Sequence, residues 1–132
     1  MVERALFLSD EWFGLNLGAA SEWPERPGVD CSVNYEVTGA PDGKVRYHAV
    51  IHNGRLAEMA SGKLADADVS IIYKYVDARA EVSGGDHPDL AYMSGRMKLD
   101  GDYGRWVFGL RPLLDSAEYD AFRAALAENT DF

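Results

Sequence analysis

The stretch GGDHPDLAYMSGRMKLDGD occupies residues 84–102, and it decides the fold of this chain. Asp86 or His87 can cap a short helix that has Pro88 in its first turn, because that turn leaves the missing N–H unpaired anyway. Gly95 is expected to end this helix, since Gly adopts the left-handed backbone of a helix end without strain. The stretch therefore predicts a short helix with defined ends.

A strand is predicted directly after this helix, because polar and apolar residues alternate over 96–100 and Gly-Asp follows at 101–102. Upstream, residues 62–72 are rich in Asp and β-branched side chains. Together these segments resemble the lipid-binding domain of the sterol carrier protein 2 family. In that family an Asp-rich strand leads to two short helices and then to Gly, basic, apolar, basic, apolar, any residue, Gly, Asp or Asn. The resemblance covers residues 62–114, and 93–102 is its most specific part.

Composition limits the classes of partner. The 132 residues carry 13 basic and 22 acidic side chains, a formal charge of −9 that disfavours nucleic acid and anionic lipid surfaces. The longest apolar runs span a few residues, whereas a membrane helix needs about 20, so stable membrane insertion is not expected. Cys31 is the single cysteine and no signal peptide is recognisable, which predicts a cytoplasmic protein. The length predicts one domain over residues 1–132.

The first half of the chain predicts a helix followed by strands. Residues 9–21 place apolar side chains at helical spacing, with Ser9 or Asp10 as the N-cap. Residues 31–38 and 45–52 then alternate, with apolar side chains at the odd positions. Each of these strands is expected to bury its odd-numbered face.

Shorter elements follow. Asn-Gly at 53–54 predicts a tight hairpin into a third strand, 55–61, which is expected at an edge of the sheet. Val, Ile and Tyr alternate over 69–73 and predict a fourth strand. A short helix is predicted over 77–82, with Asp77 as its N-cap.

The last segment is expected to be helical. Apolar residues keep helical spacing over 103–114, and Asp115 with Glu118 forms a candidate capping box for a final helix. The chain is thus predicted to be an α+β domain with a five-stranded, largely antiparallel sheet. The N-terminal helix and the helical segments 77–95 and 103–127 would cover one face. The resemblance implies that the first strand is central, which periodicity alone does not give.

Metal and cofactor sites are not predicted. His48 and His52 share one face of a strand but lie about 13 Å apart, too far for one ion. Cys31 alternates with core positions and is expected to be a small buried hydrophobe. The sequence contains no strand–Gly-x-Ser-x-Gly–helix elbow and no Gly-rich phosphate or dinucleotide loop.

An acid–base enzyme would need a carboxylate inside the predicted sheet. A small sheet with an inward Asp is the arrangement of ketosteroid isomerase-type enzymes. Glu36 and Asp100 fall on the outward face of their strands, which argues against such an enzyme. A loop carboxylate such as Asp66 or Asp68 could still reach inward.

The residues not yet assigned to any role are large apolar and aromatic side chains. Taken by composition alone, they are typical of an ordinary packed core. The resemblance implies instead an apolar tunnel between sheet and helices, in a stand-alone, bacterial-type member of the family. The candidate lipid-binding residues are Trp12, Val33, Tyr35, Tyr47, Ile71, Tyr73, Met93, Met97, Trp106 and Leu110.

The function implied is non-catalytic binding and transfer of a small apolar ligand such as a fatty acid, a sterol or an acyl-CoA. Two alternatives stay open: a small isomerase or cyclase acting on a steroid or polyketide, and an interaction module with a filled core. The sequence also leaves open whether the chain forms a homodimer.

Overall fold

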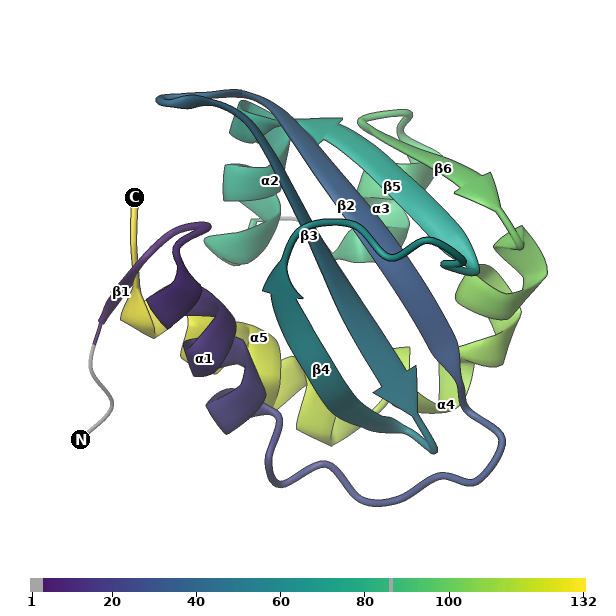
Figure 1. Cartoon of the computed structure of the whole chain (residues 1–132). Helices are drawn as coiled ribbons and strands as arrows, with labels where there is room; N and C mark the ends of the chain where they lie inside the picture. Colours follow the sequence, from purple (N-terminus) through teal and green to yellow (C-terminus); the bar gives the residue numbers. More distant parts are fainter. Residues whose placement is uncertain (1–3, 86) are drawn as a thin grey trace.

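A five-stranded sheet organises the protein, and the computed structural model describes residues 4–85 and 87–132. The strands lie in the order β4-β3-β2-β5-β6, so β2, the first strand of this sheet along the chain, is central (Figure 1). This confirms the predicted position of the first strand. The bounds are β2 (Cys31–Ala40), β3 (Gly43–His52), β4 (Arg55–Ser61), β5 (Val69–Lys74) and β6 (Met97–Gly101).

The sheet is mixed but mostly antiparallel. β2 pairs antiparallel with β3 and parallel with β5, while β3–β4 and β5–β6 are antiparallel. Tyr35 lies opposite Tyr47 on β3 and opposite Ile71 on β5, so three inward side chains form one row across the sheet. The predicted odd-numbered inward face is thereby confirmed, and β4 is an edge strand as expected.

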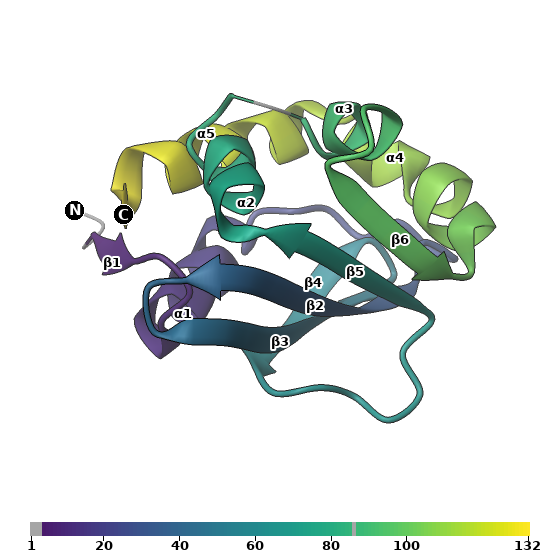
Figure 2. The same cartoon turned by 90° about the horizontal axis from the view of Figure 1, so that it is seen from above.

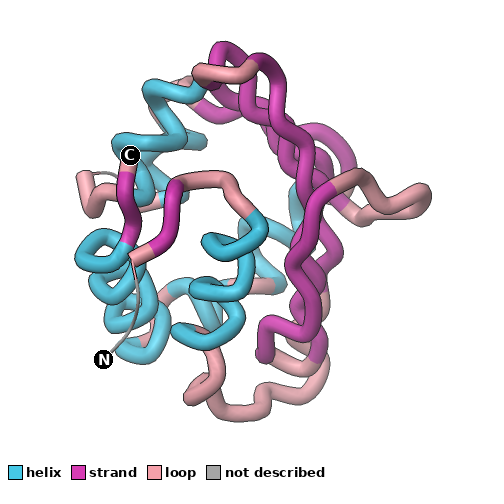
Figure 3. Tube along the Cα trace, turned by 60° about the vertical axis from the view of Figure 1, so that its left-hand side comes forward, coloured by secondary structure: helices cyan, strands magenta, loops and turns pink. Residues whose placement is uncertain are grey.

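Helices cover one face of this sheet, as Figures 2 and 3 show. A two-stranded parallel ladder of β1 and β7 joins the first and last described elements. No helix among residues 4–85 and 87–132 is both long and apolar enough to cross a bilayer. The bounds are β1 (Ala5–Leu6), α1 (Asp10–Ala19), α2 (Tyr75–Val82), α3 (Pro88–Met93), η1 (Arg105–Gly109), α4 (Arg111–Leu114), α5 (Ala117–Asn129) and β7 (Thr130–Asp131).

Two predicted helix caps are present. The Ser9 side chain accepts a hydrogen bond from the Trp12 N–H at the start of α1. The His87 side chain accepts one from the Asp89 N–H at the start of α3, while Asp86, the other candidate, lies outside the described residues. Gly95 follows α3 with a φ of 77°, which confirms its predicted role at the helix end.

Two other caps were predicted at the wrong residue. α2 starts at Tyr75 with Lys74 as the N-cap, not at Asp77, because the helix continues directly from β5. α5 is capped by Ser116, whose hydroxyl accepts from the Tyr119 N–H at 3.1 Å, rather than by Asp115. Ser is as good a cap as Asp, so the register of the helix decides which side chain caps it.

The helical spacing predicted after β6 is realised in two short pieces. η1 is a single π-helical segment of five residues, and α4 is a four-residue helix that starts at Arg111. Gly109 and Pro112 disfavour one continuous helix, because Gly has low helix propensity and Pro lacks a donor.

Candidate functional site

A cavity of about 110 Å³ lies between the sheet and its helical cover. Its surface is mostly apolar and comes from the sheet and from the helices. Nine of the ten candidate lipid-binding residues line it: Trp12, Val33, Tyr35, Tyr47, Ile71, Tyr73, Met97, Trp106 and Leu110.

The sheet contributes a row of aromatic rings. Tyr35 and Tyr47 stack with their centroids 4.6 Å apart and their planes at 10°, as cross-strand neighbours in register do. Tyr73 lies beside them, 6.5 Å from Tyr35 between centroids. On the opposite face, Glu36 accepts a hydrogen bond from Arg46 at 3.0 Å, so the carboxylate is turned away from the cavity.

The helical side of the cavity is fixed by buried anchors. Trp12 is 2% exposed, and its indole N–H donates to the Thr130 hydroxyl at 3.1 Å. Trp106 of η1 and Leu110 directly after it are equally buried. The chain ends of the fold therefore hold one side of the cavity, and the η1–α4 segment holds another.

Met93 does not line the cavity, and this prediction was wrong. Its side chain is 81% exposed on the outer face of α3, next to the exposed Leu90. Pro88 and Ala91 occupy the buried face of this six-residue helix instead. A flexible apolar side chain was assigned inward by its type, although the helix periodicity points it outward.

The cavity also contains a carboxylate that the sequence analysis missed. Glu81 of α2 lines it, together with Asn16, Trp23 and Tyr119. Asp68, one of the two loop carboxylates that the sequence left open as inward groups, instead accepts hydrogen bonds from the backbone and hydroxyl of Ser32 at 2.9 and 3.1 Å. Asp66 is exposed. A helical position, not a loop, brings the acidic group inside.

The phenols around Glu81 stay protonated. Burial raises the pKa of Tyr35 and Tyr73 well above the usual range, and Tyr47 and Glu81 nearby raise it further. Burial is also the main cause of the raised pKa of Tyr119, again with Glu81 adding to it. At neutral pH these hydroxyls can therefore donate hydrogen bonds within the cavity.

Cys31 and the histidines lie apart from this site. Cys31 is buried, and burial raises the pKa of its thiol to about 12, so the thiol is not a nucleophile at neutral pH. His48 contacts Glu58 and the Gly62 carbonyl, each at 2.9 Å, on the face of the sheet away from the cavity. His52 pairs with Asp30.

Known structures share this architecture. The crystal structure of sterol carrier protein 2 superposes with a TM-score of 0.67 at 16% identity, over 93% of this chain and 98% of that one. A conserved hypothetical protein from Thermus thermophilus gives 0.63 at 14% identity, over 100% and 97%. Palmitated SCP2L2 from Aedes aegypti gives 0.59 at 18% identity, over 80% and 90%.

Sequence comparisons alone give no such likeness: no family model and no curated protein matches the chain. The similarity therefore lies in the fold, and it extends over nearly the whole chain on both sides. The chain folds as a sterol carrier protein 2-like domain.

Proposed function

We propose that this protein binds and carries an apolar ligand without transforming it, the ligand being a fatty acid, a sterol, an acyl-CoA or a similar lipid. The observation that carries the proposal is the apolar cavity between sheet and helices, in a fold shared with sterol carrier protein 2. The palmitated state of the Aedes aegypti protein with this fold supports a lipid as the ligand.

The cavity has to expand to hold a long chain. Its volume of about 110 Å³ is below the roughly 300–1,000 Å³ that is typical of small-molecule sites. The cover consists of short helical pieces, so it can move away from the sheet more easily than the strands can separate. The ligand would then lie against the row formed by Tyr35, Tyr47 and Ile71.

Ile71→Trp tests this proposal, because Ile71 lies on β5 beside the central strand, lines the cavity and is 1% exposed. A neutral fluorescent lipid should bind the wild type with a dissociation constant on the order of micromolar, since roughly ten buried methylenes give about 0.8 kcal/mol each before the costs of immobilisation. The larger side chain should abolish binding while the fold survives.

Ile71→Val is the matched control, since it leaves the space open and should keep binding. Native mass spectrometry of gently purified protein provides an independent readout, in which a co-purified lipid is expected. A wild type that takes up no acyl or sterol probe, together with an Ile71→Trp variant that unfolds, would mean that these residues form a solid core.

A second candidate, an isomerase-type enzyme, is favoured by one observation. Glu81 lies in the cavity with Tyr35, Tyr47 and Tyr73, and a carboxylate beside a buried phenol is the catalytic pairing of ketosteroid isomerase. The test is turnover of a ketosteroid by the wild type and its loss in Glu81→Gln. Without turnover by the wild type, the carrier remains the better account.

A further inference from the structure

The cavity contains polar groups that a purely apolar tunnel does not need. We propose that these groups narrow the ligand class by its head: of the lipids named above, the cavity accepts an uncharged one with a hydroxyl, such as a sterol, and rejects the carboxylate of a fatty acid. Glu81 and Trp23 are the specificity-determining residues. This inference rests on the proposed function, because it presupposes that an apolar ligand enters the cavity.

The charge of the cavity lining is the first observation that supports this selection. Among the described residues, Glu81 is the one Asp or Glu side chain that lines the cavity, and no Lys, Arg or His side chain lines it. A ligand carboxylate would leave water for an apolar site without a cation to compensate, which is strongly unfavourable. It would also meet the acidic group of Glu81. The lining therefore disfavours an anionic head for two reasons: the burial of its charge without a cation, and its repulsion by Glu81.

Arg123 does not remove this preference. It lines a smaller neighbouring hollow between α2 and α5, which it shares with Glu81 and Tyr119. Its guanidinium donates to the backbone carbonyl of Glu81 at 3.4 Å. The Arg123 guanidinium therefore lies beside Glu81 but does not line the main cavity. The ligand head would lie inside that main cavity.

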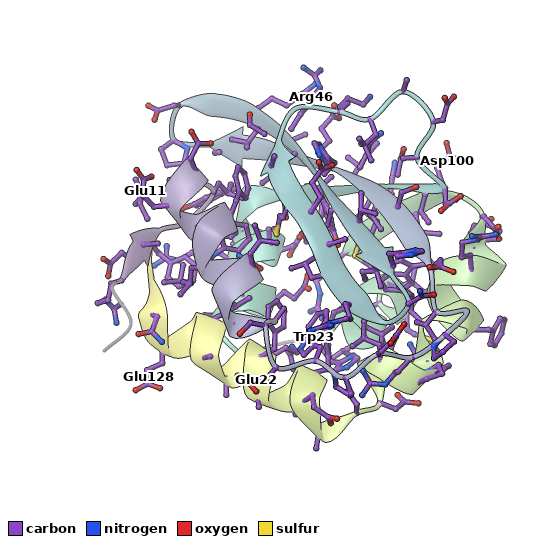
Figure 4. The ribbon with its side chains drawn as sticks, turned by 60° about the horizontal axis from the view of Figure 1, so that its bottom comes forward. Glu11, Glu22, Trp23, Arg46, Asp100 and Glu128 are labelled. Carbon is purple, nitrogen blue, oxygen red and sulfur yellow. The ribbon has the colours of Figure 1, made fainter. Side chains whose placement is uncertain are left out.

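Trp23 supplies the second, independent observation. It is 3% exposed and lines the cavity, yet its indole N–H donates to no acceptor in the described part of the chain. Figure 4 shows Trp23 beside α5, and its ring lies 4.9 Å from Phe122 and 6.0 Å from Tyr119 between centroids. A buried donor without an acceptor is costly, so an acceptor atom on the ligand is expected here.

A hydroxyl head fits both groups chemically. Its oxygen can accept from the Trp23 N–H, and its hydrogen can be donated to the Glu81 carboxyl or to a phenol oxygen. A carboxylate can only accept, and a plain alkane can do neither. Tyr119 contacts Trp23 and lines both hollows with Glu81, so all three residues belong to the same end of the cavity.

Displacement of Nile red, a neutral apolar dye, by three ligands with the same tail tests the proposal at neutral pH. The ligands are decane, 1-decanol and decanoate. For the wild type we expect 1-decanol to bind at least about tenfold more tightly than decanoate, the size of effect that one unmet charged or polar interaction produces. Decane should bind more weakly than 1-decanol.

Variants assign the effect to residues. Glu81→Gln should strengthen decanoate binding several-fold and so reduce the difference in affinity between decanoate and 1-decanol. Glu22→Gln is the matched control: it makes the same substitution at an exposed position and should change neither affinity. Trp23→Phe removes the N–H donor but keeps an aromatic ring. It should weaken 1-decanol several-fold and leave decane unchanged.

The outcomes separate the two proposals. If neither Nile red nor any of the three ligands binds, the carrier function is wrong, and the head-group selection is wrong with it. If decane and 1-decanol bind but decanoate binds equally well in the wild type, the carrier function stands and the selection is overturned. The wild-type comparison alone decides this, so it does not depend on the folding of any variant.

Discussion

The two sides of the cavity are built differently. On the sheet side, Tyr35 is held in register between Tyr47 and Ile71 by hydrogen-bonded strands of six to ten residues. On the helical side, the chain from Tyr75 to Leu114 forms helical pieces of eight, six, five and four residues around β6. Isolated helices shorter than about 12 residues are marginal in water, so these pieces depend on tertiary contacts.

The difference shows which side of the cavity can adapt to a ligand. The inner strands β3, β2 and β5 cannot leave the sheet without breaking a ladder on each side, whereas α3 or η1 can shift by exchanging a few side-chain contacts. The cover is nevertheless tied together by Arg111 of α4, which donates two hydrogen bonds of 2.7 Å to the Asp89 carboxylate of α3. Substitutions on the two sides should therefore lower the free energy of unfolding by different amounts.

The largest effect is expected for Gly101→Ala on the sheet side. Gly101 has a φ of 105°, and a Cβ there would lie 2.5 Å from the Asp68 carbonyl oxygen of the neighbouring chain segment. Backbone strain and a clash with backbone act together, so the free energy of unfolding should fall by about 3–5 kcal/mol. Urea denaturation measures this free energy. A smaller loss, of the size expected for positive-φ strain alone, would show that β6 can shift to relieve the clash.

Gly95→Ala on the helical side is the matched comparison. Gly95 also has a positive φ, 77°, but no atom lies within 4 Å of the position its Cβ would take. Only the left-handed strain remains, so the expected loss is about 1–2 kcal/mol. The same denaturation experiment applies. Equal losses at the two glycines would contradict the view that the sheet side is the rigid one.

The smallest effect is expected for Asp89→Asn, and it should depend on pH. The hydrogen bonds from Arg111 lower the pKa of the Asp89 carboxyl, and partial burial opposes them. Because the folded pKa is lowered, the stabilisation is present above the ordinary pKa of about 3.9 and is lost as pH falls through the folded value.

At neutral pH the Asn variant should lose about 1 kcal/mol or less, because the pair is partly exposed and Arg111 keeps Asp115 at 3.2 Å. In acid below the folded pKa, wild type and variant should unfold at the same urea concentration. A difference that persists in acid would assign the effect to packing instead of charge.

The same contrast explains what the sequence could predict. In β2 and β3 a period of two, bounded by turn residues, predicts both the strand and its buried face, and the Asn53-Gly54 turn sets the hairpin register. The alternation over residues 69–73 predicts β5 as a strand, but no local signal shows that it pairs in parallel with β2. The resemblance to the sterol carrier protein 2 family implied only that the first strand is central.

The short helices carry too few residues for their faces to be predicted. α2 begins at Tyr75 directly from β5, so taking Asp77 as its cap left the inward position of Glu81 unnoticed. In α3 a single turn decides that Ala91 is buried and Met93 exposed. Trp23 lies in a loop, where no periodicity applies. Only the folded structure shows that its indole N–H is buried and donates to no acceptor among the described residues.

The pairing of β2 with β5 also bears on how the chain folds. β2, β3 and β4 follow one another through tight turns, so their contacts are local and can form early. Val33 of β2 meets Val69 of β5 only after 36 residues of chain have been closed into a loop. The late step in folding is therefore the arrival of β5, and with it come α2, Glu81 and the interior that the ligand would occupy.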